Sequence, residues 1–393
     1  NFKLADAIND SAKDLKNVKT FFADNYFEFN EDNVHRFEQG QLPKGISNWV
    51  KDLKQSSNNM LKFLTKMHDA LTLDLSDGDV SKKVAEPLLS ESGHYLTRLD
   101  GFAKLWGNLS IEQSNPPHAR WLKQLEYKNH VDYLLADCPI QVGYYLHDKL
   151  WQECAGAVLC SATLSALGSF DHFAFEAGLK PIEGVKYIKA QSPFDYKENA
   201  VLTIPNISKE PNHKEFSDEL IKTLPNYIKK DQANLVLFAS YWQMNQVAEG
   251  LRKKGFSLLL QGEASRDALL TLHRDKVKNG KGSILFGTQS FSEGLDLPGD
   301  LLTNLIITKI PFAVPTSPIE QAQSEYIETK GGNPFLSITV PEAAKKLVQS
   351  CGRLLRKESD SGEITILDRR LVTKRYGKAM LDSLPPFKRK IEY

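Results

Sequence analysis

The N-terminal part of the chain carries a helical pattern of hydrophobic positions. In residues 46–67, and again in residues 84–106, apolar side chains recur close to every 3.6 residues, which is the repeat of a helix with one buried face. A run of turn-forming residues at 76–79 separates the two stripes. We therefore predict that residues 1–115 form a helical domain, and nothing in this part of the sequence points to chemistry.

From about residue 199 the pattern changes to short apolar strands that alternate with amphipathic helices. Strands are predicted at 234–239, 257–260, 283–286, 305–308 and 363–367, and helices at 242–254, 264–279, 318–329, 341–356 and 373–383. This alternation is typical of a mostly parallel sheet covered on both faces, so the fold class is α/β. Ligands of such sheets bind at the carboxyl ends of the strands, which directs attention to the loops after Phe286 and Leu367.

The segment between these two parts is less regular. Two β-rich stretches and a helix are predicted there, at 119–126, 131–136 and 144–153. Residues 157–160 form a short apolar run that we interpret as a buried strand, and the run stops at the sequence Ser-Ala-Thr-Leu at 161–164. A helix cap would explain this tetrapeptide, so by itself it is weak evidence for function.

The composition excludes several classes of protein. The 393 residues carry 50 basic and 49 acidic side chains, and a formal charge of +1 excludes a strongly basic nucleic-acid coat, although a local basic track remains possible. No apolar run approaches the ~18 residues of a membrane span. The four cysteines form no CxxC motif and no zinc-type spacing, which favours buried thiols in a reducing compartment. We expect a cytoplasmic protein with no membrane partner and no metal-ligand set.

The sharpest group of candidate functional residues lies on the helix predicted at 341–356. Gln349 and Arg353 are four positions apart and Arg356 follows three later, which would place all three on one helical face that Gly352 keeps open. Two guanidiniums held on a buried helix suit a polyphosphate whose charge changes during a reaction. The competing interpretation is a solvated basic face, which explains two arginines but not the glutamine and glycine at fixed offsets.

A second group follows the strand predicted at 283–286, in the loop GTQSFSEGLDLPG at 287–299. Its glycines let the backbone approach a ligand closely, and its hydroxyls can donate to phosphate oxygens. Its carboxylates could hold a ribose hydroxyl, position water or pair with the arginines. The residues in question are Gly287, Thr288, Ser290, Glu293, Gly294 and Asp296. The competing interpretation is an ordinary loop between a strand and a helix.

Four sequences in this order, namely SATL, LVLFAS, GTQSFSEGLDLPG and QSCGRLLR, closely resemble the motifs of superfamily 2 helicases of the XPD-like, iron–sulfur branch. KIPFAVP at 309–315 and LDRRL at 367–371 are similar to bacterial members of this branch. The resemblance covers residues 119–393 well and is mainly positional over 1–115. It implies three parts: a helical arch-like domain at 1–115, the end of helicase domain 1 with a linker at 116–198, and a RecA-like helicase domain 2 at 199–393.

The resemblance also implies roles for individual residues. Arg353 and Arg356 resemble the arginine fingers that stabilise the transition state at the γ-phosphate, with Gln349 beside them. Ser161 and Thr163 would couple the nucleotide state to the grip on DNA. Expected nucleotide contacts are Glu293, Gly294 and Asp296, together with Ser161 and Thr163. Expected DNA contacts are Gly287, Thr288 and Ser290. A late basic cluster that includes Arg369 and Arg370 is a plausible phosphate track, against the alternative of a solvated surface. Tyr241, Trp242 and Phe312 are weaker candidates for stacking on bases, since core packing is commoner.

The implied reaction is ATP hydrolysis that drives 5′→3′ movement on single-stranded DNA and unwinds duplex or branched DNA in repair. The implied cofactors are ATP, Mg²⁺ and a [4Fe–4S] cluster. We expect single-stranded, forked or branched DNA as the partner, and a monomer.

The sequence departs from the family in two large respects. It contains no GxxxxGK[ST] phosphate loop and no DEAH-type pair of acids, both of which such helicases need for phosphates and Mg²⁺. The first residue is Asn1 rather than Met. We therefore expect a carboxyl-terminal part of a helicase, with the main ATP and Mg²⁺ site and the cluster cysteines lying upstream of it, and we expect this chain alone to be inactive as an ATPase.

Two other functions compete with this one. A nucleic-acid-binding or regulatory module that has lost its ATPase would explain the missing phosphate loop, but it has no need of arginines aimed at a nucleotide. A different nucleotide enzyme, such as a sugar-nucleotide transferase, would explain the alternation of strands and helices but not SATL together with QxxGRxxR.

Overall fold

The computed structural model describes residues 2–112, 114–180 and 182–392, and the chain divides into two compact units. Unit 1 consists of Asn1–Gln141 together with Pro315–Gly332. Unit 2 consists of Val142–Val314 and Asn333–Tyr393. These limits differ from the domain limits predicted at 115 and 198, because two strands and one late helix pack with the N-terminal helices. The three predicted helicase parts stay a prediction.

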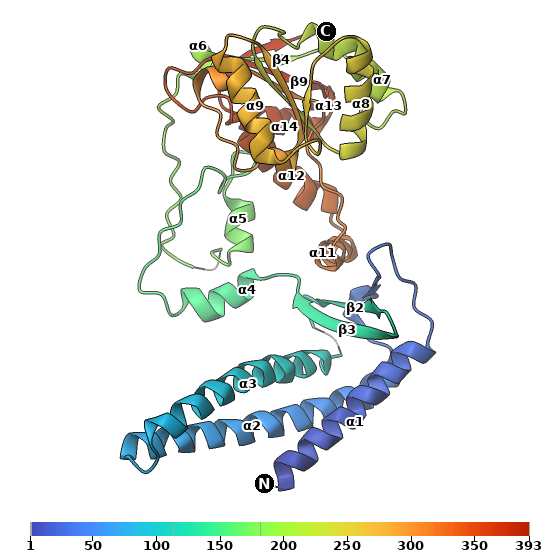
Figure 1. Ribbon diagram of the computed structural model, residues 1–393, viewed down its shortest axis with the longest axis vertical. Helices are drawn as coiled ribbons and strands as arrows, with labels where there is room; N and C mark the ends of the chain where they lie inside the picture. Colours follow the sequence, from blue (N-terminus) through green and yellow to red (C-terminus); the bar gives the residue numbers. More distant parts are fainter. Residues whose placement is uncertain (1, 113, 181, 393) are drawn as a thin grey trace. The chain divides into compact units, whose positions relative to one another are not determined.

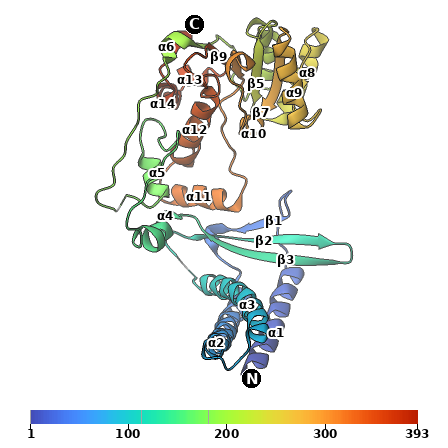
Figure 2. The same cartoon turned by 60° about the vertical axis from the view of Figure 1, so that its left-hand side comes forward.

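Unit 1 is built from long helices and a small antiparallel sheet (Figure 1). Its helices are α1 (Phe2–Asp24), α2 (Ser47–Asp77), α3 (Lys82–Leu109) and α11 (Pro318–Thr329), and its strands, in sheet order, are β1 (Val34–Phe37), β2 (His118–Tyr127) and β3 (His130–Pro139). The periodic stripes at 46–67 and 84–106 thus form α2 and α3, as predicted. Figure 2 shows α11 lying against this sheet, where Ala322 packs with Ala119 and Ile140.

A buried ion pair ties the sheet of unit 1 to the end of α3. Arg120 on β2 donates from Nε to Asp137 Oδ1 at 2.9 Å and from Nη2 to the Asn108 carbonyl at 2.6 Å. His118 Nδ1 lies 2.7 Å from Asp137 Oδ2. Burial alone would raise the pKa of Asp137, but the hydrogen bonds and charges of His118 and Arg120 outweigh it and hold the pKa below the ordinary 3.8. The Asp137 side chain is 1% exposed, so its charge depends on these partners.

Unit 2 contains a seven-stranded sheet in which every neighbouring pair is parallel. The strands, in sheet order, are β10 (Lys388–Ile391), β4 (Ala200–Ile204), β9 (Gly362–Ile366), β8 (Asn304–Ile307), β5 (Ala233–Phe238), β7 (Ser283–Thr288) and β6 (Leu259–Leu260). The helices are α4 (Gly143–Leu146), α5 (Asp171–Glu176), α6 (Tyr196–Asn199), α7 (Phe216–Thr223), α8 (Tyr241–Lys253), α9 (Arg266–Lys278), α10 (Gln289–Ser292), α12 (Val340–Cys351), α13 (Arg370–Thr373) and α14 (Arg375–Ser383). The α/β class predicted from the alternating pattern is confirmed.

Alternate side chains of the central strand β5 enter two separate cores. Leu235 and Leu237 pack with α9, α12 and α14, whereas Val236 and Phe238 pack with α7 and α8. Figure 1 shows α8 and α9 on opposite sides of the strands. Because both faces are covered, the strand is apolar from Leu235 to Phe238, which is why its sequence predicted it well.

Two predictions for the segment before this sheet are wrong. Residues 157–160 form no strand, and Val158 is 93% exposed, because an apolar run becomes a strand only where another strand supplies hydrogen bonds. Cys154 and Cys160 are exposed rather than buried. The helix predicted at 144–153 is present but short: α4 continues into one π-helical turn at His147–Trp151. Among the described residues, no helix combines the length and apolar content needed to cross a bilayer.

We predict that Asp137→Asn destabilises the β2–β3 sheet by about 3 kcal/mol, since it leaves the buried Arg120 without its counter-charge. Native-state hydrogen exchange of the β2–β3 amides measures this change. The matched control is Asp132→Asn, which breaks an exposed ion pair with Lys19 and is expected to cost less than about 1 kcal/mol. Because the folded pKa of Asp137 is lowered, its contribution is present above pH 3.8 and is lost as the pH falls through the folded value. Equal losses of stability from the two substitutions would contradict the claim that the buried Arg120–Asp137 pair stabilises the sheet.

Candidate functional site

The helix that carries Gln349 ends earlier than predicted, which changes how the arginines are placed. α12 stops at Cys351, and the next backbone bonds are tight turns, from Arg353 N to Ser350 O and from Leu354 N to Cys351 O. The Asp360 carboxylate accepts the backbone N–H groups of Arg356 and the following residue, each at 2.9 Å, and so takes the place of helical acceptors. The prediction that Gln349, Arg353 and Arg356 share one helical face is therefore wrong.

The two arginines nevertheless converge on one point of the loop after β7. Arg353 Nη1 and Arg356 Nη2 each donate to the Leu295 carbonyl oxygen at 3.0 Å. Arg356 Nε also lies 3.7 Å from Asp296 Oδ1. Asp296 thus pairs with an arginine, which is one of the roles that the sequence suggested for it. The sequence thus correctly predicted that Arg353 and Arg356 lie close together. They are brought together by their shared acceptor, the Leu295 carbonyl, and not by helical spacing.

A third arginine, which the sequence analysis missed, completes the group. Arg266 lies in the first turn of α9, donates to the Glu293 carbonyl and places its guanidinium 5.7 Å from the Phe291 ring centroid. Burial, followed by the nearby Arg356 and Arg266 charges, lowers the pKa of Arg353 below its ordinary value. We refer to Arg266, Arg353 and Arg356 as the arginine cluster. No motif contains Arg266, and only the parallel strand order predicts that the start of α9 lies near this loop.

The loop after β7 is anchored at its base and open at its tip. Thr288 donates from its backbone N to Gln261 Oε1 at 2.7 Å, and its hydroxyl lies 3.0 Å from Ser290 Oγ. Gly287 lies inside β7, where a Cβ atom would come within 2.5 Å of the Phe291 ring, so this glycine serves packing. Thr288 is also buried, and of the three DNA contacts predicted here only Ser290 is exposed.

The tip of the loop contains three of the residues predicted to contact nucleotide. Glu293, Gly294 and Asp296 are exposed, while Leu295 between them is buried and fixes the backbone. Gly294 has φ +70°, a conformation that disfavours other residues. The tip therefore offers carboxylates and open backbone directly beside the arginine cluster.

A hydrogen bond joins the SATL segment to helix α12. Gln349 Nε2 donates to Thr163 Oγ1 at 3.1 Å, and Thr163 N donates to Ser161 Oγ at 3.3 Å. One position further along α12, the buried Ser350 hydroxyl lies 3.0 Å from Gln289 Oε1 at the start of the loop after β7. The end of α12 is thus hydrogen-bonded both to the SATL segment and to the start of the loop after β7.

The basic pair after β9 has a different environment. Arg370 is 8% exposed, donates from Nη2 to Asp368 Oδ2 at 2.7 Å, and lies 5.1 Å from the centroid of the Phe312 ring. This geometry argues against a direct DNA contact by Arg370 and assigns Phe312 to packing. Arg369 is half-buried and donates to Asn206. By contrast, Tyr241 and Trp242 at the start of α8 are 50% and 70% exposed.

The cysteines differ widely in their surroundings. Cys351 is fully buried in α12, and burial raises the pKa of its thiol to about 12, which disfavours the thiolate that an iron–sulfur cluster requires. Cys154 and Cys160 lie on an exposed stretch of unit 2, and Cys138 lies in unit 1. Within the described parts of the chain, no group of three or more cysteines has its sulfur atoms gathered for a ligand.

Comparison with known proteins agrees with these motifs. Residues 224–387 match the helicase C-terminal domain family. The ATP-dependent DNA helicase DinG of Photobacterium profundum is 51% identical over 371 residues, which cover 93% of this chain and 54% of that protein. DinG of Escherichia coli is 32% identical over 370 residues, covering 92% and 51%. The chain therefore spans about half the length of the curated relatives it matches.

Two solved structures share the fold. An apo structure of XPD superposes with a TM-score of 0.50 at 14% identity, covering 99% of this chain and 72% of that one. Xpd4 of S. tokodaii gives the same TM-score and identity, covering 98% and 70%. The fold is therefore that of XPD-like proteins, and the chain is homologous in sequence to part of the DinG helicases, with a match to the helicase C-terminal domain family over residues 224–387.

Proposed function

We propose that this chain supplies the nucleotide-sensing and DNA-contacting part of an ATP-dependent DNA helicase that moves 5′→3′ on single-stranded DNA and unwinds duplex or branched DNA in repair. The observation that carries the proposal is the convergence of Arg353 and Arg356 on the Leu295 carbonyl, beside a loop whose base is linked to α12. The polarity and the role in repair rest on the family resemblance alone.

The arginine cluster suits an anion better than its present acceptor. A neutral carbonyl shared by two guanidiniums leaves most of their donors for other partners, whereas a phosphate carries opposite charge and can accept two parallel hydrogen bonds from one guanidinium. Burial is the main cause that lowers the pKa of Arg353, and the neighbouring charges of Arg356 and Arg266 add to it, so an anion beside these guanidiniums would be favourable. When bound, ATP would supply a γ-phosphoryl group whose charge shifts during hydrolysis, and Arg353 and Arg356 would stabilise that charge.

The carboxylates of the loop have a secondary role in this proposal. Asp296 is paired with Arg356, and both Glu293 and Asp296 raise the pKa of Arg353. Carboxylates engaged with arginines are poor Mg²⁺ ligands, so we place the main ATP and Mg²⁺ site on residues outside this chain. The chain alone is then inactive as an ATPase.

DNA would lie along the carboxyl edge of the parallel sheet in this proposal. Ser290 follows β7, Arg369 follows β9, and the exposed Tyr241 and Trp242 follow β5, so the topology brings all of them to that edge. Exposed aromatics beside hydroxyl and guanidinium donors are typical of single-strand binding, in which bases stack and phosphates are held. Thr163 and Gln349 would transmit the nucleotide state to this edge.

The first prediction concerns Arg353→Ala in the full-length protein. ATP hydrolysis stimulated by single-stranded DNA should fall roughly 10³-fold, because charge at the γ-phosphate loses a stabilising guanidinium, while DNA affinity stays within a few-fold. Steady-state hydrolysis and fluorescence anisotropy measure the two. Arg252→Ala removes an exposed arginine paired with Glu263 and serves as control, with both quantities unchanged. If DNA binding falls as far as hydrolysis, Arg353 is structural, and if hydrolysis is unaffected, a non-catalytic binding module becomes the better account.

The second prediction concerns the hydrogen bond between Gln349 and Thr163. In the full-length protein, Gln349→Leu and Thr163→Val should each reduce the stimulation of hydrolysis by DNA roughly tenfold, and the double variant should be no worse than either single one, because both remove the same contact. Thr65→Val on the exposed face of α2 is the control. Additive losses in the double variant would show that the two residues act separately.

The third prediction tests stacking. Trp242→Ala should weaken binding of a single-stranded oligonucleotide by about 1–3 kcal/mol, since an exposed indole that stacks on a base contributes on that order. Tyr26→Ala removes an aromatic ring that is 90% exposed in unit 1 and should leave the affinity unchanged. An unaltered affinity of the Trp242 variant would move the DNA path away from α8.

A further inference from the structure

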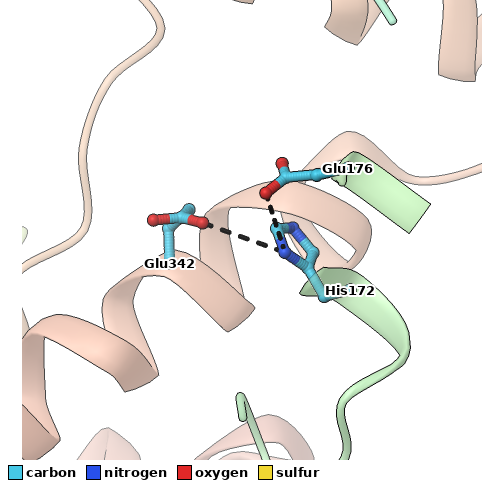
Figure 3. Close-up of side chains that lie close together, drawn as sticks. All are labelled: His172, Glu176 and Glu342. Atoms are coloured by element: carbon cyan, nitrogen blue, oxygen red, sulfur yellow. Dashed lines mark ion pairs between the residues drawn. The ribbon is translucent and has the colours of Figure 1, made fainter. Parts of the chain in front are cut away.

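Three potential metal ligands from two helices of unit 2 point toward one another outside the site described above (Figure 3). His172 and Glu176 lie one turn apart on α5, and Glu342 lies in the first turn of α12. His172 Nδ1 is 3.4 Å from Glu176 Oε2 and 3.9 Å from Glu342 Oε1. One ligand atom from each residue lies within 4.8 Å of the other two.

The distances in this group are too long for hydrogen bonds. Hydrogen bonds from a ring nitrogen to an oxygen usually span about 2.7–3.2 Å. His172 Nδ1 is shielded from solvent, and no hydrogen-bond partner for it exists within the described residues, although two carboxylates lie within 4 Å. A buried ring nitrogen left unpaired between two carboxylates is costly unless something fills the gap between them.

A divalent transition-metal ion fits that gap. Bonds of about 2.0–2.2 Å to imidazole nitrogen and carboxylate oxygen place neighbouring ligands of a tetrahedral zinc site about 3.3 Å apart. The His172–Glu176 distance of 3.4 Å matches this value, and the His172–Glu342 distance of 3.9 Å requires a small closure of the Glu342 side chain. An imidazole combined with carboxylates suits Zn²⁺ and similar ions. The Glu176 and Glu342 side chains are 52% and 36% exposed, so an ion can enter and water can complete the coordination.

One contact competes with such an ion. Lys345 forms an ion pair with the same Glu342 oxygen that faces His172. Lys345 lies three positions after Glu342 on the same helix, so an ion at this site shares the Glu342 carboxylate with the lysine or displaces it. We expect this competition to lower the affinity for the ion without preventing its binding.

We propose that His172, Glu176 and Glu342 form a binding site for a divalent transition-metal ion that clamps α5 onto α12. The clamp joins elements of the motif described above: α5 follows the SATL segment, and Glu342 precedes Gln349 by seven residues, about two helical turns. An ion held here stabilises the approach of the SATL segment to α12, on which the Thr163–Gln349 hydrogen bond depends. The site stands on its own ligands and does not require the proposed helicase activity.

The test is metal binding to the whole chain. The protein is stripped with a chelator and titrated with Co²⁺, whose visible spectrum reports the ligands, and Zn²⁺ is then added to displace it. One Co²⁺ per chain should bind with nitrogen and oxygen ligands and without a thiolate charge-transfer band, which separates this site from the exposed Cys154 and Cys160. His172→Ala and Glu342→Gln should each weaken binding by roughly tenfold or more.

The control is His213→Ala, which removes a histidine that lies 3.9 Å from a single carboxylate in the same unit. It should leave the affinity unchanged, and its circular dichroism should match that of the other variants. Zn²⁺ should also raise the unfolding temperature of the parent chain and not that of His172→Ala. Failure of the parent chain to bind, binding that survives His172→Ala and Glu342→Gln, or a thiolate band would each overturn the proposal.

Discussion

The burial of one face of helix α12 decides where the polar groups of the site are placed. Ala343, Ala344, Leu347 and Cys351 pack into the core beneath the parallel sheet, so the opposite face of the helix must carry Gln349 outward. Leu354 and Leu355 belong to the same core although the helix has ended, and they fix the chain on which the arginines sit. The apolar packing of α12 and of Leu354 and Leu355 thus fixes the positions of Gln349, Arg353 and Arg356.

The loop after β7 is held against this helix by polar contacts that span the fold. The Leu295 carbonyl accepts from two guanidiniums, and Ser350 contacts Gln289. A carbonyl is a weak acceptor for two cations, so the arrangement is well suited to change when a stronger acceptor arrives. In this account the arginines and the SATL segment respond together, because α12 contacts Thr163 and the start of the loop, and Arg353 and Arg356 follow directly after it.

The sequence predicted regular elements better than it predicted their ends and their partners. The strand at Ala233–Phe238 is buried on both faces, so its apolar run from Leu235 to Phe238 was a direct signal. The end of α12 depends on the Asp360 carboxylate, a contact that no local pattern reveals. The apolar run at 157–160 was misleading, since local hydrophobicity does not supply a neighbouring strand.

The residues of the candidate site likewise fall into those that a local sequence pattern identifies and those that only the fold brings together. Gln349, Arg353 and the loop at 287–299 could be singled out because their spacing is a motif, whereas Arg266 and Gln261 take part only because the parallel strand order brings distant residues together. Arg370 looked like a DNA contact in the sequence, but Asp368 and Phe312 take up its guanidinium. His172 and Glu342 are separated by 170 positions, so only the fold reveals that they meet.

The most direct measurement is a structure of the full-length protein bound to ADP and aluminium fluoride, which mimics the γ-phosphate during hydrolysis. The account predicts that Arg353 and Arg356 leave the Leu295 carbonyl and donate to the fluoride ligands, while the Gln349–Thr163 contact is kept or tightened. If both guanidiniums stay on Leu295 with the analogue bound, they are structural groups, and the central claim is wrong.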